Sequence, residues 1–186
     1  MKSLRPSVRY FVLGLLGTFA MGCANLELAS TPTTVVPLSG VWLVDNTSSD
    51  DIAEAMRPDK RPLSKNRLST RSEIERIRRG SGLAIVADGF QVLEANRIEI
   101  ELGDDSMGVQ HLPGVYRDVS WGLKDRGIWR VQAGWEEDAL VIASKTSGID
   151  VLERYQLVNE NRLVVRLDIK ADGNKRSILR AFRRLQ

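Results

Sequence analysis

The amino-acid sequence predicts a mainly β protein whose antiparallel strands form a meander that closes into a barrel or a strongly curved sheet. Three observations predict this fold. Apolar and polar residues alternate over most of the chain after residue 97, turn signals recur there at short spacing, and helical patterns are confined to the region before it. Alternation with a period of two indicates strands with one buried face. A sheet of about nine strands tends to curl and close, which removes its exposed edges.

The first strand is expected over residues 40–45. Turn signals such as Gly103-Asp104-Asp105 and Asp172-Gly173 divide the later part of the chain into eight more strands. These are expected near residues 98–102, 106–112, 115–121, 127–135, 139–145, 149–158, 162–170 and 176–185. Evenly spaced strands joined by tight turns are typical of an antiparallel meander.

Two or three short helices are expected between the first and second strands. The run Ser48-Ser-Asp-Asp51 is a helix-start signal, and the helix that it opens must end before Pro58. A polar loop should follow over 58–68. A capping-box pattern at Thr70-x-x-Glu73 then predicts a charged helix that ends near residue 80. Residues 82–96 are ambiguous and allow a further short helix around 83–87.

The N-terminus carries the pattern of an export signal. Three basic residues stand among the first nine, and an uncharged, mostly apolar run of eleven residues follows at 10–20. This run has the length of a signal-peptide core and is too short to span a membrane as a helix. Ala20-Met-Gly-Cys23 then resembles the lipobox of bacterial lipoproteins, although Ala20 and Met21 depart from its usual residues.

The lipobox resemblance implies cleavage between Gly22 and Cys23 and attachment of acyl chains such as palmitate to Cys23. Two or more acyl chains hold a protein stably on a membrane. Residues 1–22 are then the signal peptide, 23–38 a lipidated flexible tether rich in Thr, Ser and Pro, and 39–186 a single β-rich domain. Because residue 24 is Ala rather than Asp, the resemblance favours the outer membrane, facing the periplasm. The alternative is an ordinary secretory signal followed by a chance cysteine.

The net charge of the chain resides in this signal. The sequence has 27 Lys and Arg residues against 24 Asp and Glu, and three of the basic residues lie before Cys23. The mature chain is therefore formally neutral, which removes the main support for nucleic-acid binding. Charge is nevertheless uneven: 57–80 and 162–186 are basic, and 88–105 is acidic. A basic region suits anionic headgroups or an acidic partner, whereas the simpler interpretation is a solvated surface.

Gly40-Val-Trp42 at the head of the first strand resembles the Gly-x-Trp motif that opens lipocalins and related small barrels. In those families the Trp closes the bottom of the barrel and an Arg of the last strand packs across it. The resemblance implies such a structural pair between Trp42 and Arg180. The wider stretch from Leu38 to Asp51 also resembles the start of uncharacterised bacterial envelope proteins, from which no activity can be transferred.

Two tryptophans, Trp129 and Trp135, fall on one face of a predicted strand. They are candidates to line an apolar cavity, since pockets favour aromatic residues, or they belong to the core. Asp45, with the oxygen-bearing residues that follow at alternate positions, mimics the spacing of a calcium loop. The sixth and twelfth positions do not fit it, so these residues are interpreted as a helix cap.

Catalytic signatures are missing from the sequence. His111 is the only histidine and Cys23 the only cysteine, so neither a zinc site nor a Cys-His site is expected, and no cofactor motif is present. We expect a non-enzymatic lipoprotein with a structural or protein-interaction role in the cell envelope. The alternative is a lipocalin-like module that binds a lipid or another apolar ligand. A hydrolase or isomerase that uses carboxylates is a third hypothesis.

Overall fold

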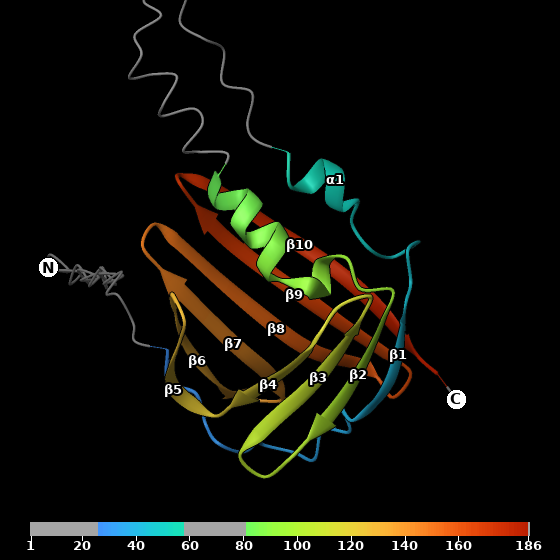
Figure 1. Cartoon of the computed structure of the whole chain (residues 1–186). Coiled ribbons are helices and arrows are strands. Elements are labelled where there is room, and N and C mark those ends of the chain that lie inside the picture. The colour runs from blue at the N-terminus through green and yellow to red at the C-terminus, as the bar shows by residue number, and fades with distance from the viewer. Residues whose placement is uncertain (1–25, 58–80, 186) are drawn as a thin grey trace, which may run out of the picture.

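The computed structural model describes residues 26–57 and 81–185, which form one antiparallel sheet and short helices (Figure 1). The sheet has ten strands in the order β4-β3-β2-β1-β10-β9-β8-β7-β6-β5, so the predicted mainly β meander is confirmed. The strands are β1 (Gly40–Val44), β2 (Arg97–Leu102), β3 (Ser106–Leu112), β4 (Tyr116–Ser120), β5 (Gly122–Arg126), β6 (Trp129–Glu136), β7 (Ala139–Thr146), β8 (Ile149–Asn159), β9 (Arg162–Ala171) and β10 (Asn174–Arg184).

The sheet rolls into a nearly closed, lipocalin-like barrel (Figure 1). β1 pairs with β2 on one side and with β10 on the other, which joins the first strand of the chain to the last. β4 and β5 are the two edges of the sheet, and only Trp121 separates them in the chain. In the described part of the chain, no backbone pairing links β4 to β5, so the ring of hydrogen bonds is interrupted there.

β5 is the one strand that the sequence pattern does not predict. All five of its residues, Gly122–Arg126, are exposed, and the strand therefore buries neither face. Alternation of apolar and polar residues arises only where one face of a strand is buried, so this edge strand carries no such signal. The other nine strands lie within a few residues of their predicted bounds.

The helices also lie where the sequence places them, between β1 and β2. α1 (Ile52–Ala55) begins at Asp51, whose side chain accepts a hydrogen bond from the backbone N–H of Glu54 at 3.1 Å. This contact confirms the helix-cap interpretation. A helix over 81–89 and a 3-10 turn, η1 (Gln91–Leu93), cross one end of the barrel (Figure 1). The predicted loop at 58–68 and the predicted helix at 70–80 lie outside the described residues.

The register of the strands shows which side chains face the barrel interior, because directly opposed residues lie on the same face of a sheet. One such row joins Trp135, Leu140, Tyr155, Val165 and Arg180 across β6 to β10. All five are at most 6% exposed. Buried apolar side chains from these strands, from β1–β4, from the 81–89 helix and from η1 form one continuous core. The interior is therefore filled largely by side chains.

The segment before β1 runs along the end of the barrel opposite the helices (Figure 1). Ala29 and Trp135 exchange backbone hydrogen bonds of 2.8 Å in both directions, and Leu38 is fully buried. Gly134 permits this approach, since a Cβ there would lie only 2.6 Å from the carbonyl oxygen of Ala29. Within the predicted tether at 23–38, Leu26, Ala29 and Leu38 thus contact the barrel.

Candidate functional site

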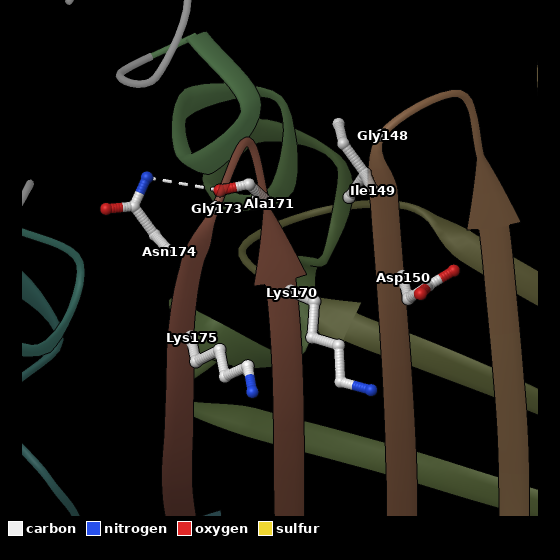
Figure 2. A pocket seen from close by; sticks show the side chains of 8 residues that line it. All are labelled: Gly148, Ile149, Asp150, Lys170, Ala171, Gly173, Asn174 and Lys175. Carbon is white, nitrogen blue, oxygen red and sulfur yellow. Dashed lines mark hydrogen bonds between the residues drawn. The ribbon is translucent and has the colours of Figure 1, made fainter.

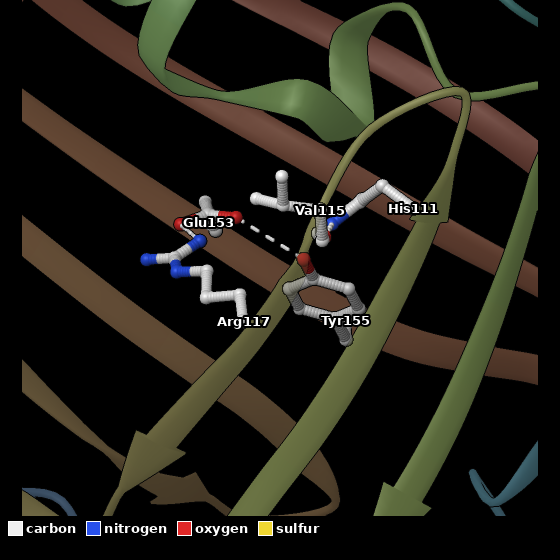
Figure 3. A network of polar contacts seen from close by, with 5 residues as sticks. All are labelled: His111, Val115, Arg117, Glu153 and Tyr155. Atoms are coloured by element: carbon white, nitrogen blue, oxygen red, sulfur yellow. Dashed lines mark hydrogen bonds and ion pairs between the residues drawn. The ribbon is translucent and has the colours of Figure 1, made fainter.

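A polar network lies inside the barrel near the interruption between β4 and β5 (Figure 3). The Glu153 side chain is fully buried, and its carboxylate forms an ion pair with Arg117. Arg117 Nη1 donates a hydrogen bond of 2.7 Å to it. The Tyr155 hydroxyl donates to the other carboxylate oxygen at 3.1 Å. Because Arg117 comes from edge strand β4 and the other two residues from β8, the ion pair connects strands that are not neighbours in the sheet.

Burial and the Glu153 carboxylate set the protonation of the groups around it. Burial raises the pKa of Tyr155 well above its usual value, and the neighbouring carboxylate raises it further. Burial is the largest single effect and opposes the charge on Arg117, but the attractions of Glu153 and Tyr155 and the hydrogen bond to Glu153 together outweigh it, so the pKa of Arg117 is raised. At neutral pH Arg117 is therefore charged and paired with Glu153, and the Tyr155 hydroxyl is neutral.

His111 lies beside this network on β3. Burial lowers its pKa from the usual value, which keeps the imidazole neutral at neutral pH. Its Nδ1 lies 3.4 Å from the carbonyl oxygen of Val115, and Nε2 is buried with no hydrogen-bond partner among the described residues. A buried ring nitrogen without a partner is unfavourable, and a ligand with a matching polar group would satisfy it.

A cleft of about 310 Å³ opens onto solvent beside His111 and Arg117. It lies between the end of the 81–89 helix and the β3–β4 turn, where Gln91 accepts a 2.7 Å hydrogen bond from the backbone N–H of Val115. The remaining residues that line it are Gly89, Tyr116, Asp118 and Arg126. This volume is at the lower end of the range for small-molecule sites, about 300–1,000 Å³.

Phe90 stands in the chain between Gly89 and Gln91, which both line the cleft. Its ring is 4% exposed and packs edge-on against Trp129, with ring centroids 5.4 Å apart. The guanidinium of Arg117 lies 5.8 Å from the centre of the same ring. Phe90 thus fills the space between the helical cap and the barrel wall, in contact with both the aromatic lining and the polar network.

Arg180 is a second interior cation, and its surroundings differ from those of Arg117. It is 6% exposed, its Nη2 donates to the carbonyl oxygen of Ala95 at 3.0 Å, and its Nε has no partner among the described residues. Within the same residues no carboxylate lies at ion-pair distance from it. Burial accordingly lowers the pKa of Arg180. A buried cation without a counter-ion is costly, so this position favours an anion.

The predicted pairing of Trp42 with Arg180 is wrong in its second member. Trp42 is fully buried at the end of the barrel, but the guanidinium that stacks on it, 4.1 Å from the ring centre, belongs to Arg184. The register explains the difference, since Trp42 on β1 is opposite Arg184 on β10 and β1 ends before it reaches Arg180. Arg184 also donates hydrogen bonds to the carbonyl oxygens of Pro37, Ser39 and Glu160.

Trp129 and Trp135 both face the interior, as predicted. Trp135 is buried in the core and packs edge-on against Trp121, with centroids 6.3 Å apart. Trp129 is half-buried and reaches Phe90 near the entrance. Of the two, Trp129 contacts Phe90, whose chain neighbours Gly89 and Gln91 line the cleft, and Trp135 has a core position.

The remaining predictions concern the lipobox, the basic run, a metal site and a membrane span. Gly22, Cys23 and most of the basic run at 57–80 lie outside the described residues. Within residues 26–57 and 81–185, no group of three or more His, Cys, Asp or Glu side chains is arranged to hold a metal ion. None of the described helices is long and apolar enough to span a membrane.

Sequence reasoning did not select Glu153, Tyr155 or Arg117 as site residues. A signal was nevertheless present, because Glu153 has the same alternation phase in β8 as the buried Val151 and Tyr155. Arg117 likewise shares the phase of the buried Val119 in β4. A charged residue on the apolar face of an alternating strand identifies a buried charge, and a buried charge requires a partner.

A nearly closed antiparallel barrel with an interior polar network defines the structural class of the protein, a lipocalin-like barrel. Comparison with solved structures supports this class. The chain is similar to the wild-type fluorescent protein UnaG, with a TM-score of 0.51 and 17% identity over 80% of this chain and 97% of that one. A mutant of the same protein gives a TM-score of 0.49 at 16% identity. This level of similarity shows the fold alone. No protein-family model and no curated protein matches the chain.

Proposed function

We propose that this protein is a ligand-binding barrel, anchored to the cell-envelope membrane through acyl chains on Cys23, that takes a small apolar ligand with an anionic group. The observation that carries the proposal is Arg180, a cation inside the barrel that is 6% exposed and has no carboxylate partner among the described residues. A carboxylate on a ligand would supply the missing charge and accept a hydrogen bond from Nε.

The surroundings of Arg180 suit such a ligand. Its opposed neighbour on β9 is the fully buried Val165, and the ring of Phe182 lies 6.0 Å from its guanidinium. Ala95, which accepts the hydrogen bond from Arg180, donates its own N–H to the carbonyl of Gln91. Since Gln91 lines the cleft, one turn of the chain, from Gln91 to Ala95, separates Arg180 from the cleft.

Entry of a ligand requires movement at the cap. The core is closely filled, and Phe90, which stands between the cleft residues Gly89 and Gln91, is buried in it. Rotation of Phe90 away from Trp129 is the movement we propose, and it breaks no strand pairing. The cleft volume of about 310 Å³ indicates a small ligand or a short part of a longer one.

Binding can be tested with decanoate that carries a carbon-13 carboxylate and with its methyl ester, by NMR on the full chain in lipid nanodiscs. We expect decanoate to bind and the ester to bind at least about tenfold more weakly, equivalent to 1.4 kcal/mol. Arg180→Met should abolish this preference, and Arg183→Met, on the exposed face of the same strand, should retain it. Equal binding of acid and ester by the wild-type chain would refute the role given to Arg180.

A structural or protein-interaction role is the second candidate, and the filled interior favours it. Trp42, Tyr155 and Phe182 are each fully buried, and a hollow carrier would leave part of such side chains accessible. Crosslinking of the full chain in intact cells distinguishes the two functions. A stoichiometric envelope partner that is retained in Arg180→Met would support this second role. Both roles are non-enzymatic.

The anchor has its own test. The lipobox resemblance at Ala20–Cys23, and Ala rather than Asp at residue 24, support attachment to the outer membrane with the barrel in the periplasm. Cys23→Ala should remove the acyl mass from the mature chain and release it from the membrane fraction. A mature Cys23→Ala chain that still sediments with membranes at high salt would show that the lipid is not what holds the protein there.

A further inference from the structure

The outer face of the barrel carries a row of charged side chains on its β5–β10 side. Directly opposed residues connect β10 to β5 through this row, and all six are exposed: Lys175, Lys170, Asp150, Lys145, Arg130 and Asp125. Four are cations and two are anions, and the Arg130–Asp125 contact is a loose one at 3.7 Å. The row therefore presents excess positive charge across six neighbouring strands.

The barrel as a whole is electrically polarised. The outer face of β5–β10 carries eight cations against four anions, since Arg154, Arg162, Arg166 and Arg183 add to the row and only Asp168 and Glu136 oppose them. The outer face of β2–β4 has the opposite sign, with Glu99, Glu101 and Asp118 against Arg97. An anionic surface would therefore attract the β5–β10 side and repel the β2–β4 side.

A hollow of about 310 Å³ lies at the end of this row, between the tips of two hairpins. Figure 2 shows the side chains of Lys170, Lys175 and Asp150 on the same side of β8, β9 and β10. Gly148 and Gly173 stand in the two hairpin turns beside Ser147 and Asp172, and the Asp172 carboxylate approaches Gly148, with Oδ1 3.4 Å from the position of a Cβ there. The hollow has room for a phosphate group between the two lysines.

The first described residues bring the chain to this same face. The carbonyl oxygen of Leu26 accepts a 2.6 Å hydrogen bond from the side chain of Gln132, which lies two residues from Arg130 on β6. Three residue steps separate Leu26 from Cys23. An extended chain spans at most about 3.3–3.6 Å per residue, so Cys23 lies within roughly 11 Å of Leu26.

Exposed apolar side chains occupy the neighbouring edge. Leu123 on β5 is opposed to Gln132 and is 57% exposed, and Ile128 in the β5–β6 turn is 68% exposed. Apolar side chains beside a row of cations are typical of surfaces that contact the interface of a membrane. They lie on the same side of the barrel as the point where the chain arrives from Cys23.

We infer that the outer face of β5–β8, with the adjoining lysines of β9 and β10, rests on the anionic phospholipid headgroups of the membrane that holds the anchor. Lys145, Lys170, Lys175 and Arg130 contact lipid phosphates, and Leu123 and Ile128 enter the headgroup layer. This orientation rests on the proposed acylation of Cys23, because the short chain from Cys23 to Leu26 confines this side to the membrane. The acidic β2–β4 face then points away from the bilayer.

The orientation can be measured with one spin label at a time on the acylated full chain. Acylation blocks the only natural thiol, so an introduced cysteine is the sole labelling site. Lys145→Cys reports the proposed contact, and Glu101→Cys on β2 is the matched control on the opposite face. The vesicles are phosphatidylcholine with one quarter phosphatidylglycerol, and a nickel-chelating lipid serves as the relaxing agent at headgroup level. We expect relaxation several-fold stronger at position 145 than at position 101.

Two charge reversals test the electrostatic basis. Lys145→Glu with Lys170→Glu should abolish the orientation, measured with a label at Arg130→Cys against Glu101→Cys. Arg162→Glu with Arg183→Glu makes the same charge change at the other end of the same face, away from the proposed phosphate contacts, and should weaken the contrast much less. Equal relaxation at positions 130 and 101 in the otherwise unchanged chain would overturn the inference.

The mass of the intact protein separates this inference from the proposed anchor. If the purified chain lacks acyl mass and its Cys23 takes the label, the anchor has failed and the orientation argument fails with it. If the acyl mass is present and positions 130 and 101 relax equally, the anchor stands and the orientation alone is wrong.

Discussion

Replacement of Arg117 by Met would leave the Glu153 carboxylate inside the barrel without its cation. The two partners differ in their access to water: the Glu153 side chain is fully buried, whereas 27% of the Arg117 side chain is exposed beside the cleft. Loss of the arginine therefore leaves a charge that cannot reach solvent. Loss of the carboxylate leaves the charge of Arg117, which can reach solvent.

This difference sets the expected sizes of the effects. Breaking a buried ion pair by removing one partner costs about 3–5 kcal/mol. The Tyr155 hydroxyl still donates to Glu153, and the cleft admits water near Arg117, so we expect about 2–4 kcal/mol for Arg117→Met. Glu153→Gln should cost less, about 1–2 kcal/mol, since Arg117 can turn toward the cleft. Against a usual domain stability of about 5–15 kcal/mol, both effects are measurable.

The assay is urea unfolding of the mature chain at pH 7, followed by tryptophan fluorescence, for wild type, Arg117→Met, Glu153→Gln and the double variant. The double variant should be more stable than Arg117→Met alone, because it no longer buries an unpaired carboxylate. Arg130→Met, an exposed arginine on β6, is the control and should change stability by less than about 0.5 kcal/mol. Additive losses in the double variant would refute the asymmetry.

Three further outcomes are expected. Because burial lowers the pKa of His111 below 6.5, its neutral form stabilises the fold above pH 6.5, and this contribution is lost as the pH falls. Urea unfolding at pH 7 and pH 5 should show a smaller acid loss in His111→Gln, and an identical loss would contradict it. Because the pKa of Tyr155 is raised above 10 in the folded chain, the Tyr155 hydroxyl ionises above pH 10 only in the unfolded chain, and stability should fall there. Tyr155→Phe should reduce that fall. Arg184→Ala should lower the thermal midpoint through loss of about 1–3 kcal/mol, whereas Arg183→Ala should not.

Much of the fold follows from local sequence patterns. Nine strands were predictable because each has one buried face, and hairpin turns such as the one at Gly173 separate them. The cap at Asp51 was equally predictable, since it depends on residues within one helical turn. β5 was not, because an edge strand with no buried face leaves no alternation.

The site was less accessible to sequence reasoning because it depends on register and on contacts between distant strands. The alternation phase marks Glu153 as inward-facing, but nothing local shows that Arg117, 36 positions earlier, reaches it. The same limit explains why Arg180 was predicted to stack on Trp42, whereas Arg184 does so. Both lie on the inward phase of β10, and the pairing of β10 with β1 decides which one meets Trp42.

The interrupted pairing between β4 and β5 leaves two strands whose outer backbone groups are free to recruit another chain. Unprotected edges of this kind are sites of aggregation, and charged side chains are a common defence. β5 carries Lys124, Asp125 and Arg126, and Arg126 lies 3.8 Å from Asp118 on β4. A second molecule that adds a strand there must first desolvate this charge. The charge on β5 thus protects the open edge of the barrel against strand addition by a second molecule.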